Sequence, residues 1–173
     1  MKYKRVYLNG YMAAGKSTIG ARLAEKLGFS FIDIDKYIEE KYFMSIPSIF
    51  ANEGEASFRN KEKQALKELS DFENVVIATG GGTPCFFDNM EVILSTGLSI
   101  YLKTPKELLI KRLLQNNSQR PIVKGKSRDE LSDFIDKAMS QREPFYLRSN
   151  IVCVSDDDLT ADMLIQKLNN YSV

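Results

Sequence analysis

Apolar and polar positions along the chain follow two patterns: short apolar runs typical of buried strands, and longer stretches in which apolar residues recur at helical spacing. The short runs predict strands at 5–10 (RVYLNG), 29–33 (FSFID), 74–82 (NVVIATGGG, ending in glycines), 98–102 (LSIYL) and 151–154 (IVCV). The stretches between them predict helices that begin at about residues 16, 36, 55, 88, 105, 129 and 160. Strands that alternate with helices favour a three-layer α/β domain with a mostly parallel sheet. Ligands of such sheets bind beyond the carboxyl ends of the strands, so the residues that follow each strand are the first candidates for chemistry.

The second strand runs into the stretch FIDIDKYIEE, in which apolar and acidic residues alternate. If the strand continues, Asp33 and Asp35 share one face and lie roughly 7 Å apart, with Ile32 and Ile34 on the other face. Two carboxylates that close repel each other unless a cation or a strong hydrogen-bond donor lies nearby. The alternative is a solvent-facing strand end followed by a charged helix, and this stretch alone does not decide between the two.

Composition bounds the class of protein. The chain has 173 residues, 43% hydrophobic residues and a net charge of +1, as expected of one ordinary soluble domain without a nucleic-acid or membrane partner. The apolar runs are too short to span a bilayer or to form a signal peptide. Cys85 and Cys153 have no framework spacing, so we expect reduced, structural thiols in a cytoplasmic protein.

The chain contains no histidine. This excludes Ser-His and Cys-His nucleophile pairs and every His-ligated zinc site, and two cysteines cannot alone make a four-cysteine site. A general base must therefore be a carboxylate or, less commonly, a lysine or tyrosine.

The stretch GYMAAGKST, residues 10–18, fits the phosphate-loop pattern G-x-x-x-x-G-K-[ST] and lies between a predicted strand and a predicted helix. Backbone N–H groups of such a turn surround phosphate oxygens, and the helix N-terminus adds partial positive charge. Lys16 would reach the β- and γ-phosphates, and the Ser17 hydroxyl would bind Mg²⁺. The alternative is an ordinary strand-to-helix turn with a surface lysine.

A phosphate loop changes the interpretation of the acids and of the glycines at 80–82. Nucleotide-bound Mg²⁺ commonly takes an acid from a second strand end, often through water, and Asp33 is best placed for that role. Asp35 lies further out, toward the position of an acceptor. Three glycines after a strand are costly in backbone entropy, which favours a backbone that approaches a ligand closely over the alternative of a loose loop.

Three arginines, Arg59, Arg120 and Arg142, are candidates for recognition of a carboxylate or a phosphate, because a planar guanidinium suits both groups. The alternative for each is a solvated or ion-paired surface residue. Phe58 should face the core and so anchor the turn that aims Arg59.

Six stretches occur in an order that resembles the shikimate kinase family nearly end to end. They are the phosphate loop, FIDIDKYIEE, IPSIFANEGEASFRNKE, GGG after a strand, RP in a polar loop, and REPFY before the last strand. The phosphate loop alone is shared by many functions. The elements F-x-D-x-D, G-E-x-x-F-R, G-G-G and R-x-P-x-Y in this order are far more specific.

The resemblance implies a P-loop kinase of the nucleoside-monophosphate-kinase type, with flanking helices and a five-stranded parallel sheet in the order 2-3-1-4-5. Residues 1–173 would form a single kinase domain, with a substrate-binding segment at about 33–61 and a mobile lid at about 112–127. The implied reaction is phosphorylation of the 3-hydroxyl of shikimate by ATP with Mg²⁺, in aromatic amino-acid biosynthesis, by a monomer.

The resemblance also implies roles for individual residues. ATP would be bound by Gly10, Ala13, Ala14, Gly15, Lys16, Ser17, Thr18, Arg112 and Arg120. Shikimate would be bound by Asp35, Arg59, Gly80, Gly81, Gly82 and Arg142, with the two arginines on its carboxylate. Lys16, Asp35 and Arg120 would be catalytic, and Ser17 and Asp33 would hold the metal, Asp33 through water. Asp35 would either remove the proton of the acceptor hydroxyl or orient that hydroxyl.

Two residues depart from the family pattern. Ala13 and Phe43 stand where glycine is usual, and if Ala13 needs a positive φ, the alanine costs on the order of 1 kcal/mol. Phe43 would alter the turn before the I-x-x-I-F segment.

Three other functions share some of these features. A gluconate or nucleoside-monophosphate kinase of the same fold should lack the paired F-x-D-x-D and G-E-x-x-F-R elements. A GTPase switch needs N-K-x-D and D-x-x-G, which the chain lacks. A non-catalytic homologue has no reason to keep Asp35.

Overall fold

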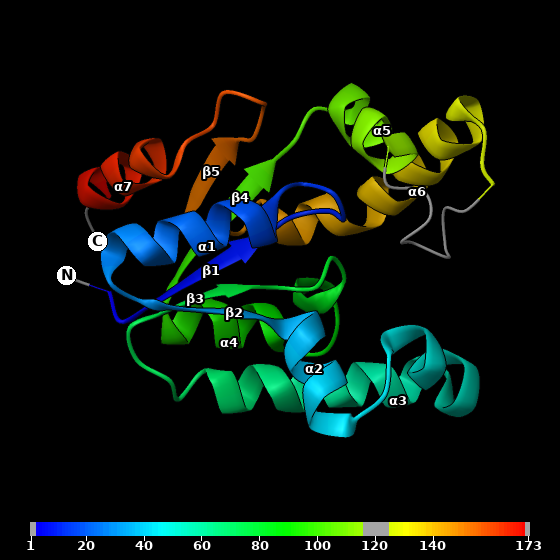
Figure 1. The fold of residues 1–173 in the computed structure, drawn as a ribbon, viewed down its shortest axis with the longest axis horizontal. Coiled ribbons are helices and arrows are strands. Elements are labelled where there is room, and N and C mark those ends of the chain that lie inside the picture. The colour runs from blue at the N-terminus through cyan, green and yellow to red at the C-terminus, as the bar shows by residue number, and fades with distance from the viewer. Residues whose placement is uncertain (1–2, 116–124, 172–173) are drawn as a thin grey trace.

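The computed structural model describes residues 3–115 and 125–171 (Figure 1). Its strands are β1 (Arg5–Asn9), β2 (Ser30–Asp33), β3 (Val75–Ala78), β4 (Leu98–Lys103) and β5 (Ile151–Val154). Its α-helices are α1 (Lys16–Leu27), α2 (Ile34–Tyr42), α3 (Ile46–Leu69), α4 (Asn89–Thr96), α5 (Lys106–Gln115), α6 (Arg128–Tyr146) and α7 (Ala161–Asn170). A short 3₁₀ helix, η1 (Thr83–Cys85), follows the glycines. None of the helices in these described ranges is long and apolar enough to cross a membrane.

The strands form one sheet in the order β2-β3-β1-β4-β5, and every neighbouring pair is parallel. The predicted order 2-3-1-4-5 is therefore confirmed. β1 lies at the centre, where Val6 pairs with Val76 on one side and Leu98 on the other. A parallel strand at the centre of such a sheet is covered on both faces, which is why β1 reads as a continuous apolar run.

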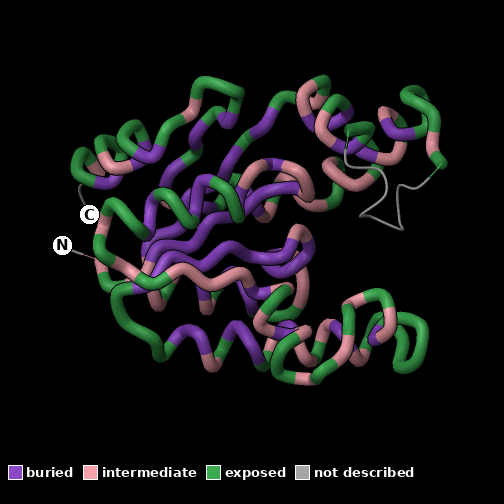
Figure 2. The backbone as a smooth tube through the Cα atoms, in the orientation of Figure 1, coloured by how far each residue is buried: buried purple, intermediate pink, exposed green. Residues whose placement is uncertain are grey.

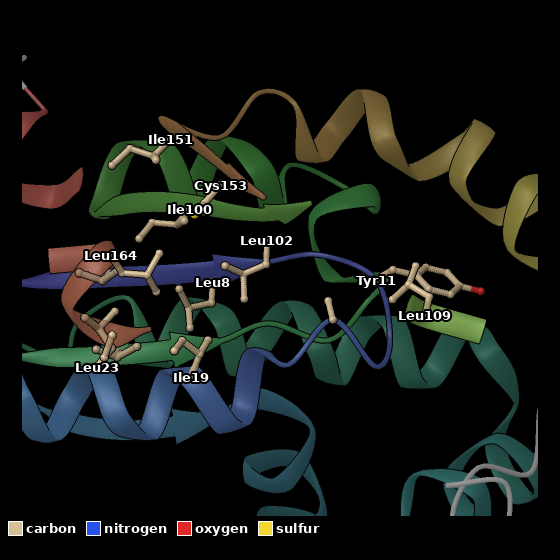
Figure 3. Close-up of a cluster of buried hydrophobic side chains, with 14 of the residues drawn as sticks. Leu8, Tyr11, Ile19, Leu23, Ile100, Leu102, Leu109, Ile151, Cys153 and Leu164 are labelled. Atoms are coloured by element: carbon tan, nitrogen blue, oxygen red, sulfur yellow. The ribbon is translucent and has the colours of Figure 1, made fainter. Parts of the chain in front are cut away.

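Alternate residues of β1 pack against different helical layers. Val6 and Leu8 lie in one apolar cluster with Leu23 of α1 and Leu164 of α7 (Figure 3). Tyr7 points to the opposite face, into a second cluster built largely from α2, α3, α4 and β3. The tube in Figure 2 shows the central strands β1, β3 and β4 buried between layers whose outer surfaces are exposed, whereas the edge strands β2 and β5 are less buried. The carboxyl ends of the strands are thereby held rigidly, and the loops that follow them carry the polar residues.

The prediction that strand alternation continues to Asp35 is wrong. β2 ends at Asp33 and α2 begins at Ile34, so Asp35 lies in the first turn of a helix. The physical reason is helix capping: the Asp33 carboxylate accepts the backbone N–H of Asp35 over 3.0 Å, and aspartate is among the best N-cap residues. Ile34 and Ile38, four residues apart, are then buried on one helical face.

The predicted helix from residue 55 is part of the longer helix α3, which begins at Ile46. Gly54, with φ 82° and ψ 172°, interrupts it, so the segment consists of two helical pieces joined at a kink. The kink changes the direction of the chain within the expected substrate-binding segment, between Asp35 and Arg59. Of the expected lid at 112–127, the structure describes only residues 112–115 and 125–127.

Candidate active site

The phosphate loop connects β1 to α1 and holds three residues at positive φ: Gly10 at 146°, Ala13 at 62° and Gly15 at 89°. Gly10 leaves no room for a side chain, because a Cβ there would lie 2.9 Å from the carbonyl oxygen of Leu102. Gly15 is the N-cap of α1 and offers no side-chain oxygen to the first N–H groups of the helix. These donors, together with the helix dipole, form a site for an anion such as phosphate.

Lys16 bends back over this loop. Its ammonium group donates to the carbonyl oxygens of Gly10 at 2.8 Å and Tyr11 at 2.9 Å. The side chain is largely buried, so its positive charge stays inside the concave loop rather than in solvent. A phosphate entering the loop would meet this charge at short range.

The loop is anchored by residues that follow two other strands at the same edge of the sheet. The carbonyl oxygen of Ala14 accepts hydrogen bonds from the hydroxyls of Thr104 at 3.4 Å and Ser155 at 3.0 Å, which follow β4 and β5. Neither anchoring residue was identified from the sequence. Thr18, the last residue of the motif, lies exposed in the first turn of α1.

The two expected metal ligands are in contact. The Ser17 hydroxyl donates to Asp33 Oδ2 over 2.5 Å. A hydroxyl and a carboxylate are hard oxygen donors, and Mg²⁺ bound with a nucleotide needs few protein ligands because phosphates and waters supply the others. The pair therefore fits a magnesium ion at the mouth of the phosphate loop, although the described residues contain no cluster of three acidic or thiol ligands.

Asp35 lies beside Gly80, where a Cβ would come within 2.7 Å of Asp35 Oδ1. The pKa of Asp35 is raised to about 6, first by burial and next by the neighbouring carboxylates of Asp33 and Glu62, while Lys16 opposes the rise. The acid is thus poised to exchange a proton near neutral pH, as a general base requires.

The three glycines separate the charged groups of the site. A Cβ on Gly82 would meet Nη1 of Arg59 at 2.7 Å, and one on Gly81 would lie 3.7 Å from Nη1 of Arg142. No acceptor within residues 3–115 and 125–171 is found for the N–H groups of Gly80, Gly81 or Gly82. The backbone here is closely surrounded by charged side chains and has donors to offer, as expected of a ligand-binding segment.

Arg59 is aimed by its neighbours. Its guanidinium lies 4.0 Å from the ring centroid of Phe86 and 5.1 Å from that of Phe58. The expectation that Phe58 faces the core is confirmed, since this side chain is buried. Arg59 also pairs with Glu62 at 2.9 Å and with the exposed Glu55 at 3.1 Å.

Glu62 is a site residue that sequence reasoning missed. It is 1% exposed, pairs with Arg59 through Oε2 and accepts the Thr83 hydroxyl on Oε1 over 2.5 Å. The signal was its position three residues after Arg59, where one helical turn brings the two side chains together. Glu62 thus fixes the direction of Arg59 and ties it to the loop after the glycines.

Arg142 and Arg112 approach from two further helices. Arg142 of α6 lies with its guanidinium 5.7 Å from the Tyr11 ring centroid, near the phosphate loop. Arg112 of α5 donates to the carbonyl oxygen of Ala13 at 3.2 Å and pairs with Asp157 at 3.0 Å. The structure therefore brings the expected residues together around one loop. Arg120 lies outside the described residues.

Comparison with known proteins gives one family. The family model described as shikimate kinase matches residues 12–171. A shikimate kinase of Bacteroides fragilis is 48% identical over 152 residues, covering 88% of this chain and 85% of the relative. One of Parabacteroides distasonis is 48% identical over 157 residues, covering 91% of each chain.

Two solved structures share the fold. A shikimate kinase from Bacteroides thetaiotaomicron has a TM-score of 0.90 and 43% identity, covering 96% of this chain and 97% of its own. One from Acinetobacter baumannii, in complex with shikimate, has a TM-score of 0.85 and 34% identity, covering 97% and 92%. The likeness thus extends over nearly the whole chain in both sequence and fold.

Proposed function

This chain belongs to the shikimate kinase family, and we propose from its site how it phosphorylates shikimate with ATP as the phosphoryl donor. The γ-phosphoryl group of ATP passes to the 3-hydroxyl of shikimate, giving shikimate 3-phosphate and ADP in aromatic amino-acid biosynthesis. The observation that carries this assignment is the meeting of Asp35 and Arg59 at the glycines, beside the phosphate loop. Shikimate has hydroxyls that the Asp35 carboxylate can accept hydrogen bonds from, and one carboxylate that the Arg59 guanidinium can bind.

The nucleotide would lie with its phosphates in the loop at residues 10–18. Lys16 would exchange its two carbonyl partners for the β- and γ-phosphate oxygens, and the N-terminus of α1 would add donors. Arg112 would pack on the adenine, a role supported by its contact with the loop at Ala13. Ser17 and Asp33 would hold Mg²⁺, Asp33 through water, and the ion would neutralise charge on the phosphates.

The acceptor would lie across the glycines. Arg59 and Arg142 would bind the carboxylate from two sides, while the amides of 80–82 would face the ring. Asp35 would hydrogen-bond the hydroxyls and accept the proton as the 3-hydroxyl attacks the γ-phosphorus. Catalysis in this arrangement rests on positioning and charge neutralisation, as is general for phosphoryl transfer.

The remaining parts of the proposal concern the chain as a whole. Residues 1–173 would act as a single domain and a monomer in the cytoplasm, with no nucleic-acid or membrane partner. The substrate-binding segment at about 33–61 contains both Asp35 and Arg59. The lid at about 112–127 would bring Arg120 over the phosphates and exclude water that would otherwise hydrolyse ATP.

The test is ADP release measured side by side with shikimate, gluconate, AMP and no acceptor. We expect a large stimulation by shikimate alone. Stimulation by gluconate or AMP without stimulation by shikimate would overturn the proposed substrate, and equal rates in all four reactions would overturn transfer to an acceptor.

A further inference from the structure

Tyr146, the last residue of α6, joins two parts of the site that lie far apart in the sequence. Its side chain is fully buried, and its hydroxyl donates to the carbonyl oxygen of Gly81. Burial raises the pKa of this phenol, and the positive charge of Arg142, one helical turn earlier, lowers it, so the guanidinium lies close to the same side chain. A buried phenol needs a partner for its hydroxyl, and here that partner is Gly81, a residue expected to touch the substrate.

The contact with Gly81 fixes the orientation of a whole peptide group and not of the carbonyl oxygen alone. The carbonyl of Gly81 and the N–H of Gly82 belong to one planar trans peptide and point in opposite directions. By holding the carbonyl, Tyr146 therefore sets the direction of the Gly82 N–H. A Cβ on Gly82 would meet the Arg59 guanidinium, so this donor belongs to the residue that borders one proposed carboxylate-binding group.

The Tyr146 ring is itself held in place. It packs on Tyr101 with centroids 5.2 Å apart, and the Tyr101 hydroxyl donates to Glu143 at 3.2 Å. Tyr101 therefore supports the same ring without touching the glycines through its hydroxyl. The pair provides a natural comparison, because only one of the two hydroxyls reaches the site.

We propose that Tyr146 is a positioning residue whose hydroxyl holds the Gly81–Gly82 peptide and the Arg142 guanidinium in the geometry that binds the carboxylate end of the acceptor. The inference rests on the proposed function, in which Gly81, Gly82 and Arg142 bind shikimate. Tyr146 touches neither substrate and acts only through these groups. A hydrogen bond between the α6 end and the glycines would thus determine acceptor affinity.

The experiment compares Tyr146→Phe with Tyr101→Phe in the full chain. Each change removes one hydroxyl and keeps the stacked rings. We expect Tyr146→Phe to raise the KM for shikimate roughly five- to tenfold, with the KM for ATP unchanged, and Tyr101→Phe to leave both KM values unchanged. Loss of folded protein lowers kcat without changing either KM, so the comparison holds even for a destabilised variant.

A double-mutant cycle tests whether Tyr146 acts through Arg142. The shikimate KM is measured for Arg142→Lys, Tyr146→Phe and both together. We expect the combined effect to be smaller than the product of the single effects, because Tyr146 loses one of its functions once the guanidinium is gone.

The outcomes separate this inference from the proposed function. If the unaltered protein phosphorylates shikimate but Tyr146→Phe matches Tyr101→Phe, or the cycle shows independent effects, the positioning role is refuted and the function stands. If both KM values rise together in Tyr146→Phe, the hydroxyl supports the fold generally and the role is again refuted. If the unaltered protein does not act on shikimate, the proposed function itself fails.

Discussion

Asp35 combines a buried position with a carboxyl group whose pKa is raised to about 6, by burial first and by Asp33 and Glu62 next. An acid of this kind is ionised at neutral pH and still basic enough to accept a proton from an alcohol during phosphoryl transfer. When no substrate is present, the buried charge of Asp35 also lowers the free energy of unfolding. The same residue therefore gives one prediction for turnover and an opposite one for stability.

Asp35→Asn should retain ATP binding and lose nearly all transfer, with kcat lowered by roughly 100-fold or more, because the amide cannot accept the proton. Steady-state ADP release gives the rate, and titration calorimetry gives the affinity for ATP. Asp133→Asn, at an exposed position of α6, is the matched control. Near-wild-type turnover in Asp35→Asn would remove the base role.

In the metal-free and ligand-free protein, Asp35→Asn should increase stability above pH 6. Below about pH 3.8 the carboxyl is protonated in both folded and unfolded chains, so it carries no cost there. Between pH 3.8 and about 6 only the unfolded chain ionises, and stability falls as the pH rises. The rise in pKa corresponds to roughly 3 kcal/mol at and above pH 7.

Urea unfolding of the wild type and Asp35→Asn in EDTA, from pH 4 to pH 8, measures this difference. The stabilities should converge at the acid end and diverge toward the basic end. A constant difference at every pH would mean that the substitution acts through packing rather than through charge.

Arg59→Ala should raise the KM for shikimate by roughly 10- to 100-fold and change the KM for ATP little, since a charge-assisted contact to the carboxylate is lost. The protein should also lose stability, because Glu62 keeps its buried charge without this cation. Both KM values are therefore measured on one preparation. Arg148→Ala, which removes an exposed ion pair with Glu91, serves as the control. Equal rises in the two KM values would argue against a carboxylate clamp.

At the scale of elements, the two residues that depart from the family pattern share one backbone conformation. Ala13 and Phe43 both adopt positive φ, at 62° and 51°, where glycine carries no steric penalty. Ala13 lies within the phosphate loop, and Phe43 is the C-cap of α2 with its side chain 95% exposed. Ala13 therefore has the positive φ at which the steric cost of an alanine applies.

Phe43→Gly should stabilise the protein by about 1 kcal/mol, because glycine favours the left-handed C-cap and the exposed ring contributes little packing. The thermal midpoint should rise by about 2–4 °C for a chain of this size. Phe43→Ala separates the two effects, since it removes the ring and keeps the Cβ. An equal gain in both variants would assign the effect to the ring and not to the backbone.

Sequence patterns predicted the five strands and their order along the chain, because each strand is a short apolar run with a polar residue at its end. The order of the strands in the sheet came from the family resemblance. They failed at Asp35, where two periodicities overlap: Ile32 and Ile34 alternate as in a strand, while Ile34 and Ile38 recur as in a helix. The N-cap at Asp33 favours the helix, and this depends on a hydrogen bond that residue order does not reveal. Of the motif positions within the described residues, Asp35 lies against Gly80, Arg59 against Gly82 and Arg142 near Gly81.

The supporting contacts could not be predicted, because they join residues that are distant along the chain. Thr83 reaches Glu62 across 21 residues, and Tyr146 reaches Gly81 across 65. Such pairs depend on how the helices pack against the sheet, and no local sequence pattern predicts them. A spacing of three or four residues on one helix, as between Arg59 and Glu62, is the exception that sequence can suggest.

At the scale of the whole molecule, the large exposed apolar side chains of the described residues are distributed over several elements. Phe43 follows α2, Phe72 follows α3, and Leu147 follows α6. Stable self-association usually needs a contiguous apolar patch. We therefore expect a monomer, and sedimentation equilibrium should return a mass near 19.7 kDa at micromolar concentrations. A mass that doubles with concentration in this range would contradict this expectation.

The central place of β1 has a consequence for synthesis on the ribosome. Arg5 pairs with Val75, seventy residues later, and Val6 pairs with Leu98 later still. At roughly 5–20 residues per second, the first partner strand is made about 4–14 s after β1. During that interval the nascent chain carries its central strand without a neighbour, and we expect chaperones that bind extended apolar segments to bind at Val6–Leu8.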